Sequence, residues 1–255
     1  MGETEGDLRW RARELVCEAA EARTNEDALR LLHAALDLDF ECIDALLMKT
    51  RLECRSARHY LQQLRGIVDL AERQLGAAFF DENRGHFWLV TESRPYLRAR
   101  CWLADALVDA EQCDEAIPHY EAMLDLNPMD NLGARYHLMG CYLLLRQIGG
   151  ARWLFESSPD EVSAVFSWAK VLERYLADDL PGSRRALAVA SEVNAHVQSY
   201  LTGRKRIPRR VPDCYSPGDP SEAAYCACLL KPAWRRHKAA LAWLKSYQDG
   251  LKEVR

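Results

Sequence analysis

The stretch that decides the fold runs from Arg98 to Pro128 and reads RARCWLADALVDAEQCDEAIPHYEAMLDLNP. Its apolar residues recur with the spacing of two helix faces, Leu103, Ala104 and Leu107 on the first and Ala116, Tyr120 and Met123 on the second. We interpret Ala116 as the small residue that a close helix crossing requires. Pro128 cannot continue a helix because it has no N–H group. The stretch therefore predicts one helix pair that ends at Pro128.

The same layout follows twice more along the chain. One copy comprises Leu138, Met139, Tyr142, Ala151, Phe155 and Pro159, and the other comprises Trp168, Val171, Leu172, Tyr175, Leu176, Ala186 and Ala190. The small residues Ala116, Ala151 and Ala186 are 35 residues apart. A period of this length is typical of stacked helix pairs. The pattern resembles the tetratricopeptide consensus, which implies an all-α protein: an α-solenoid of antiparallel helix pairs.

The remaining segments predict four parts of the chain. Residues 1–76 have the apolar spacing of degenerate helical repeats, and residues 77–95 show no sustained helical period. We expect an interrupting loop there, with a short extended piece at Phe87–Val90. Residues 96–200 hold the tetratricopeptide repeats, with Gly149-Gly150 as a turn, and residues 201–255 form a basic strap and a helical cap. A cap is needed because an array that ends abruptly exposes an apolar face.

A narrower resemblance covers roughly Arg94 to Leu244. It rests on TESRPYLRAR at Thr91–Arg100 and on a C-terminal set of residues, namely Gly218, Asp219, Glu222, Ala223, Trp234, Ala240, Leu241 and Leu244. These stretches resemble bacterial tetratricopeptide proteins related to the suppressor-of-tumorigenicity-seven family. The resemblance implies an architecture and no reaction. The chain departs from the family pattern at Cys214, Cys226 and Cys228.

Composition favours a reduced, cytoplasmic globular protein. The 255 residues are 49% hydrophobic and 28% charged, which is unlike a disordered chain. The start, MGETEGDLRW, lacks the apolar region of a signal peptide, and no window of about 18 apolar residues predicts a membrane span. The nine cysteines are scattered, and several fall on apolar helix faces, where a thiol behaves as a small hydrophobe.

Charge is divided unevenly along the chain. Residues 201–255 carry 12 Lys and Arg against 5 Asp and Glu, whereas residues 1–200 carry 22 against 33. A possible anion-binding strip is formed by Arg204, Lys205, Arg206, Arg209 and Arg210. The alternative, which we favour, is a strap that lies against the acidic repeats and is held extended by Pro208 and Pro212.

Neither a metal site nor a catalytic site is expected. Cys226 and Cys228 have the wrong spacing for a zinc knuckle with Cys214 and His237, and on a helix they point about 200° apart. His86 lies in a loop beside acidic residues, but a surface or packing role is the commoner one. No glycine-rich phosphate loop is present, so we predict no cofactor, no catalytic residue and no enzymatic activity.

The first helices of such repeats form a concave surface that takes up peptides. The repeat register places a set of residues there, Arg98, Cys101, Asp105, Tyr136, Gly140, Trp168, Val171 and Tyr175. Alternatively, Trp168 and Tyr136 belong to the core between repeats. The predicted function is a non-enzymatic adaptor that binds a protein or peptide and no membrane. A nucleic-acid-associated factor that uses the strap at 204–210 is the alternative.

Overall fold

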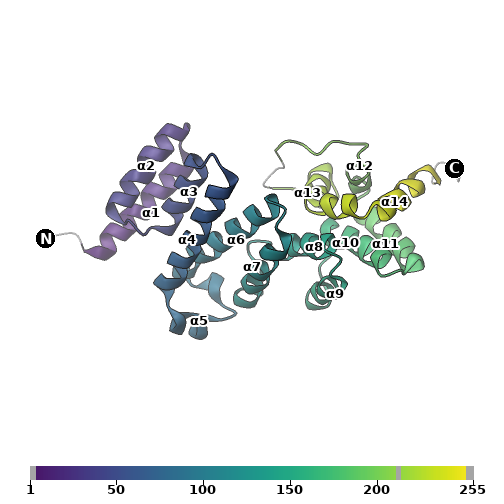
Figure 1. The fold of residues 1–255 in the computed structure, drawn as a ribbon, viewed down its shortest axis with the longest axis horizontal. Coiled ribbons are helices and arrows are strands. Elements are labelled where there is room, and N and C mark those ends of the chain that lie inside the picture. The colour runs from purple at the N-terminus through teal and green to yellow at the C-terminus, as the bar shows by residue number, and fades with distance from the viewer. Residues whose placement is uncertain (1–3, 211–213, 251–255) are drawn as a thin grey trace. The chain divides into compact units, whose positions relative to one another are not determined.

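The computed structural model describes residues 4–210 and 214–250, and within these ranges every regular element is a helix (Figure 1). The chain divides into two compact units, Met1–Ala134 and Arg135–Arg255, here called unit 1 and unit 2. This division falls inside the predicted repeat segment 96–200. The predicted boundaries at residues 76, 95 and 200 remain predictions.

Unit 1 consists of three helix pairs and one short helix. The elements are α1 (Glu5–Glu21), α2 (Asn25–Leu38), α3 (Ile43–Glu53), α4 (Ala57–Leu75), α5 (Ala77–Asn83), α6 (Arg94–Asp109) and α7 (Cys113–Leu126). Hydroxyl groups of Thr4, Thr24 and Ser56 cap α1, α2 and α4 by accepting backbone N–H bonds. Each pair buries apolar residues against its neighbour, and α3 and α4 both pack on α6.

The segment between α4 and α6 differs from the predicted loop. It contains α5 and two short 3-10 helices at Phe87–Leu89 and Thr91–Ser93, so the extended piece expected at Phe87–Val90 is wrong. Phe87 is fully buried, and its ring lies 5.1 Å from that of Phe80, which in turn lies 5.1 Å from Tyr96 of α6. The buried Ser93 hydroxyl donates to the Phe87 carbonyl oxygen. These tertiary contacts fold the segment onto α6.

Unit 2 contains two complete helix pairs followed by C-terminal helices. The elements are α8 (Ala134–Leu144), α9 (Ile148–Ser157), α10 (Ala164–Leu176), α11 (Leu180–Val193), α12 (Val197–Leu201), α13 (Pro220–Arg236) and α14 (Lys238–Gly250). The helix α13 packs against α10, α12 and α14. The C-terminal segment is therefore helical, as predicted.

Three helix pairs have the same type of turn between their two helices, and this turn fixes the repeat register. Glu111, Arg146 and Asp178 each adopt a positive φ of 60°, 56° and 60°. In each turn the next N–H group donates to the carbonyl five residues back, with N–O distances of 2.8, 2.7 and 2.9 Å. The first two turns are 35 residues apart and the second and third are 32 apart. The second interval is shorter because α9 has 10 residues where α7 has 14.

This register corrects one predicted position. The fourth residue of α7 is Ala116 and the fourth residue of α9 is Ala151, and both are buried. The fourth residue of α11 is Ser183. Ser183 is fully buried and donates its hydroxyl proton to the Val171 carbonyl at 2.8 Å, whereas Ala186 is only half-buried. The constant 35-residue spacing of small residues is therefore wrong for the third repeat.

Gly149 and Gly150 also differ from their predicted role, because both lie inside α9 and the turn is made by Arg146. A Cβ atom on Gly150 would lie 2.7 Å from the Tyr142 ring. The missing side chain thus lets α9 approach α8 closely. The fold is all-α and consists of tetratricopeptide-like antiparallel helix pairs with a helical C-terminal segment. Among the described helices, none has both the length and the apolar character that crossing a membrane requires.

Candidate functional site

In unit 2, the face predicted to bind a partner is covered by the chain's own C-terminal helices. A Cβ atom on Gly140 of α8 would lie 2.9 Å from the Leu229 carbonyl oxygen of α13. The ring of Tyr136 lies 6.5 Å from that of Tyr225 in α13, and the ring of Tyr175 lies 5.2 Å from that of Trp243 in α14. The first helices of this unit therefore use that face to bind α13 and α14.

Trp168 is not available to a partner, because its exposed fraction is 0% and its Nε1–H donates to the Asn194 carbonyl at 3.2 Å. The partner-binding prediction for Trp168 is wrong, and the core alternative is correct. Tyr136 is half-buried, and its hydroxyl donates to Glu161 Oε2 at 2.9 Å. Burial, followed by the bond to Glu161, raises the pKa of Tyr136.

The Gly-Asp-x-x-Glu sequence at residues 218–222 performs a structural task. Gly218 has a positive φ of 80°, and Asp219 Oδ1 caps α13 by accepting the N–H groups of Ser221 and Glu222. Glu222 is 3% exposed and accepts bonds from Ala164 N, Asn194 Nδ2 and Gly218 N at 3.0, 2.9 and 2.7 Å. One carboxylate thus joins the start of α10 to the start of α13.

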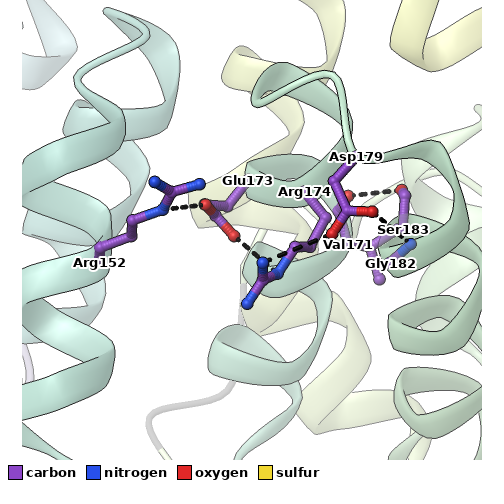
Figure 2. A network of polar contacts seen from close by, with 7 residues as sticks. All are labelled: Arg152, Val171, Glu173, Arg174, Asp179, Gly182 and Ser183. Atoms are coloured by element: carbon purple, nitrogen blue, oxygen red, sulfur yellow. Dashed lines mark hydrogen bonds and ion pairs between the residues drawn. The ribbon is translucent and has the colours of Figure 1, made fainter.

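A second buried carboxylate connects α9 to α10 (Figure 2). Glu173 is fully buried, and its Oε1 accepts a bond from Arg152 Nε at 2.7 Å. Its Oε2 lies 3.4 Å from Arg174 Nε, and Arg174 also reaches Asp179, the N-cap residue of α11. A buried charge of this kind needs partners to offset its desolvation. The arrangement has a structural role, because the two arginines neutralise the carboxylate that connects the helices.

In unit 1, the predicted residues Arg98, Cys101 and Asp105 lie along α6 on the side of α3. Arg98 donates two bonds to Asp44 of α3, from Nε at 2.7 Å and from Nη2 at 2.6 Å. Asp105 accepts the Tyr120 hydroxyl proton at 2.6 Å, and the Cys101 thiol lies 3.8 Å from the same carboxylate. Burial, and then the charge of Asp105, raises the pKa of Cys101. These contacts hold the three side chains in defined positions.

Two cavities lie at opposite ends of α3 and α6. The larger has a volume of about 390 Å³ and is lined by α1, the α2–α3 turn, the end of α4 and the start of α6. The smaller has a volume of about 210 Å³ and is lined by Arg51, Tyr60, Trp102, Asp105, Ala106 and Asp109. We call the surface between them, along α3 and α6, the seam. The sequence pattern did not reveal Asp44 and Arg51, because the degenerate consensus around α3 gave no register. It also did not single out Trp102 of α6, which lies outside the consensus positions.

The strap at 204–210 is exposed on unit 2. The side chains of Arg204, Lys205, Arg206, Arg209 and Arg210 are exposed, and only Ile207 is half-buried. Within the described part of unit 2, no carboxylate forms an ion pair with Lys205, Arg206, Arg209 or Arg210. The expectation that the strap lies against the acidic repeats remains a prediction. Pro212, which was expected to hold the strap extended, lies outside the described residues.

The cysteine and histidine candidates lie in different environments. Cys226 is buried and Cys228 is exposed, as expected for two residues on opposite sides of a helix, and Cys214 is exposed. His86 is exposed, and its backbone N–H donates to the Asn83 carbonyl. Among residues 4–210 and 214–250, no three His, Cys, Asp or Glu side chains are grouped as metal ligands would be.

The helix pairs and their shared type of turn define an all-α fold of tetratricopeptide-like antiparallel helix pairs. No protein-family model matches the chain, and no curated protein matches it. Among solved structures, the chain is similar to YrrB, described as a TPR protein with an unusual peptide-binding site. That match has 18% sequence identity and a TM-score of 0.47, and covers 74% of this chain and 86% of YrrB. The resemblance to the suppressor-of-tumorigenicity-seven family remains a prediction.

Proposed function

We propose that the chain is a non-enzymatic adaptor that binds a basic, extended peptide segment along the seam of unit 1. The observation that carries this proposal is the surplus of carboxylates around the two cavities. In unit 2 the equivalent helices are covered by α13 and α14, which leaves the first helices of unit 1 as the peptide-binding face.

Charge around the seam favours a basic partner. Six carboxylates and three guanidinium groups line the two cavities, namely Asp39, Glu41, Asp44, Glu92, Asp105 and Asp109 against Arg9, Arg13 and Arg51. Unit 1 as a whole has 26 Asp and Glu against 15 Lys and Arg. A surface of one sign attracts a segment of the opposite sign and disfavours a segment of its own sign.

Aromatic side chains supply anchoring contacts beside these charges. The Arg51 guanidinium lies 5.6 Å from the centre of the Trp102 ring, and Tyr60 lines the same cavity. Phe40 is 78% exposed and stands between Asp39 and Glu41, which both line the larger cavity. Large aromatic residues at an interface contribute a disproportionate share of binding free energy.

The chemistry of the seam supports binding without catalysis. Cys101 is the cysteine among the predicted groove residues, and its raised pKa keeps the thiol protonated. A thiol in that state is a poor nucleophile. Asp105 is held by Tyr120, and Asp44 is held by Arg98. Asp105 therefore acts as a fixed charge, whereas the charge of Asp44 is offset by Arg98.

Peptide binding to full-length protein tests the proposal. Fluorescent seven-residue peptides, one rich in Lys and Arg and one rich in Glu, are titrated by anisotropy at low and moderate salt. The basic peptide should bind more tightly, and its affinity should fall with salt. The double variant Glu41→Lys, Glu92→Lys, here called the seam variant, should weaken binding about tenfold or more, because it replaces attraction by repulsion.

The matched control is Glu18→Lys with Glu82→Lys, which changes the charge of unit 1 equally at exposed positions outside the cavities. It should retain most of the affinity. Equal binding of the acidic peptide, or equal losses in the two double variants, would show that the seam does not recognise a basic segment. Thermal unfolding of each variant establishes that it is folded.

A further inference from the structure

The two units carry opposite net charge, and the boundary between them separates the signs. Unit 1 has 15 Lys and Arg against 26 Asp and Glu, whereas unit 2 has 19 against 12. Within unit 2, residues 135–200 are balanced at seven of each sign. The positive surplus therefore comes from residues 201–255, which include the strap.

The strap offers its charges to solvent. Residues 204–210 form no helix or strand, and the ammonium group of Lys205 lies 4.7 Å from the centre of the Tyr200 ring. Arg206, Arg209 and Arg210 have exposed side chains and no carboxylate partner among the described residues of unit 2. Such a run of like charges repels itself, so an acidic partner surface would relieve that repulsion.

Contacts at both ends hold the strap on unit 2. Upstream, Leu201 is buried and the Lys205 N–H donates to the Ser199 carbonyl at 2.9 Å. Downstream, the Tyr215 ring stacks on Tyr225 of α13, with centroids 5.2 Å apart and planes at 25°. Most of the strap therefore lies in the chain between two residues, Lys205 and Tyr215, that contact unit 2. A surface that binds the strap must therefore approach unit 2 from outside.

We infer that the strap of one chain, Arg204–Arg210, occupies the seam in unit 1 of a second copy of the chain. The inference rests on the proposed function, because it names the basic segment that the seam binds. Seven residues span at most about 23 Å when fully extended. The 16 residues of α6 span about 24 Å, so the seam is long enough for the whole strap and opposite to it in charge.

This contact joins unlike surfaces, so it leaves one seam and one strap unused in each pair of chains. Head-to-tail contacts of this kind extend into longer assemblies unless they close into a ring. The inference therefore requires assemblies that grow with protein concentration. They should shorten as salt is added, because exposed charges are screened.

Sedimentation velocity of the full-length chain tests the inference, from about 1 µM to about 100 µM, where contacts of moderate affinity titrate. The wild-type chain should form dimers and larger species at low salt. The strap variant, Lys205→Gln, Arg206→Gln and Arg209→Gln, should weaken association about tenfold, because each exposed ion pair contributes roughly two- to threefold. A matched variant, Arg185→Gln, Lys238→Gln and Lys245→Gln, removes three exposed charges elsewhere in unit 2 and should associate normally.

Mixing two defective variants identifies the occupant as a second copy. The strap variant retains a functional seam, and the seam variant retains a functional strap. At the concentration where the wild-type chain is half associated, each variant alone should be mostly monomeric. Their mixture should form a one-to-one complex and nothing larger, because only one strap–seam contact remains.

Three results would overturn the inference. The wild-type chain could stay monomeric while a synthetic strap peptide binds the strap variant more tightly than the wild type. That result places the strap in the seam of its own chain. Association that requires RNA or DNA and is lost on nuclease treatment assigns the strap to nucleic acid. A monomeric mixture excludes the second copy. If an unrelated basic peptide still binds the wild-type seam, the proposed function stands while this inference fails.

Discussion

At the scale of single residues, the buried polar side chains of unit 2 hold elements together that are distant in sequence. Glu222 accepts bonds from the start of α10, from Asn194 and from the loop before α13. A carboxylate has only acceptor sites and suits three donors. An amide of the same shape would direct a donor at one of these N–H groups.

We therefore expect Glu222→Gln to lower the free energy of unfolding by about 2–4 kcal/mol, since a buried donor loses its partner. Urea unfolding followed by circular dichroism measures this difference. Glu192→Gln, at an exposed position of α11, serves as the control and should be nearly neutral. A neutral Glu222→Gln variant would mean that the carboxylate does not support the junction.

His119 of α7 provides a pH-dependent contribution in unit 1. Burial, then the charges of Arg100 and Arg65, lowers the pKa of His119 to about 4. His119 lines a cavity that Asp69, Glu72 and Glu115 also line. Its Nδ1 atom is buried without a hydrogen-bond partner in the described structure. The folded state therefore resists a proton that the unfolded chain accepts near pH 6.5.

Between pH 6.5 and pH 4, the unfolded state binds more protons at this site, so the free energy of unfolding falls as pH falls. Urea midpoints at pH 7 and pH 5 should differ more in the wild type than in His119→Gln. His59→Gln alters an exposed histidine and should keep the wild-type difference. An unchanged difference in His119→Gln would rule out this contribution.

At the scale of elements, the helix crossings decide which small residue matters in each pair. Ala116, Ala151 and Ser183 occupy equivalent places after the shared turn, and all three are fully buried. The sequence alignment by a constant 35 residues selected Ala186 instead. Helix length caused the error, because α9 is about one turn shorter than α7.

Replacing Ala116, Ala151 or Ser183 by Leu should overpack a crossing and lower the free energy of unfolding by about 1–3 kcal/mol. Ser183→Leu also removes the bond to the Val171 carbonyl. Ala186→Leu is the internal control, and we expect a change below about 0.5 kcal/mol because this side chain is half-buried beside an open cavity. Equal losses at residues 183 and 186 would contradict the structural register.

At the scale of the whole molecule, the two units use the same helix pairs differently. The first helices of unit 2 pack against α13, through Gly140 and Leu229 for example, whereas those of unit 1 border cavities. Hydrogen exchange distinguishes the two cases. Binding of a basic peptide should slow amide exchange in α1, α3 and α6 and leave α8 and α10 unchanged.

The seam variant at the same peptide concentration should show no such protection. Protection of α8 and α10 would mean that α13 is displaced on binding, and it would move the binding face to unit 2. Amide exchange reports local opening, so each helix is measured separately within one intact protein.

Periodicity and small residues in the sequence determined the helix pairs, the all-α class and the face on which Tyr136, Gly140 and Tyr175 lie. Those features depend on local spacing, since a helix repeats every 3.6 residues wherever it packs. Only the tertiary structure decided which face remains open. Its determinants are long-range contacts: α13 covers α8 and α10, Arg98 reaches Asp44 across 54 residues, and Glu222 reaches Ala164 across 58. A linear pattern places residues on a helix, but it does not reveal which distant segment covers them.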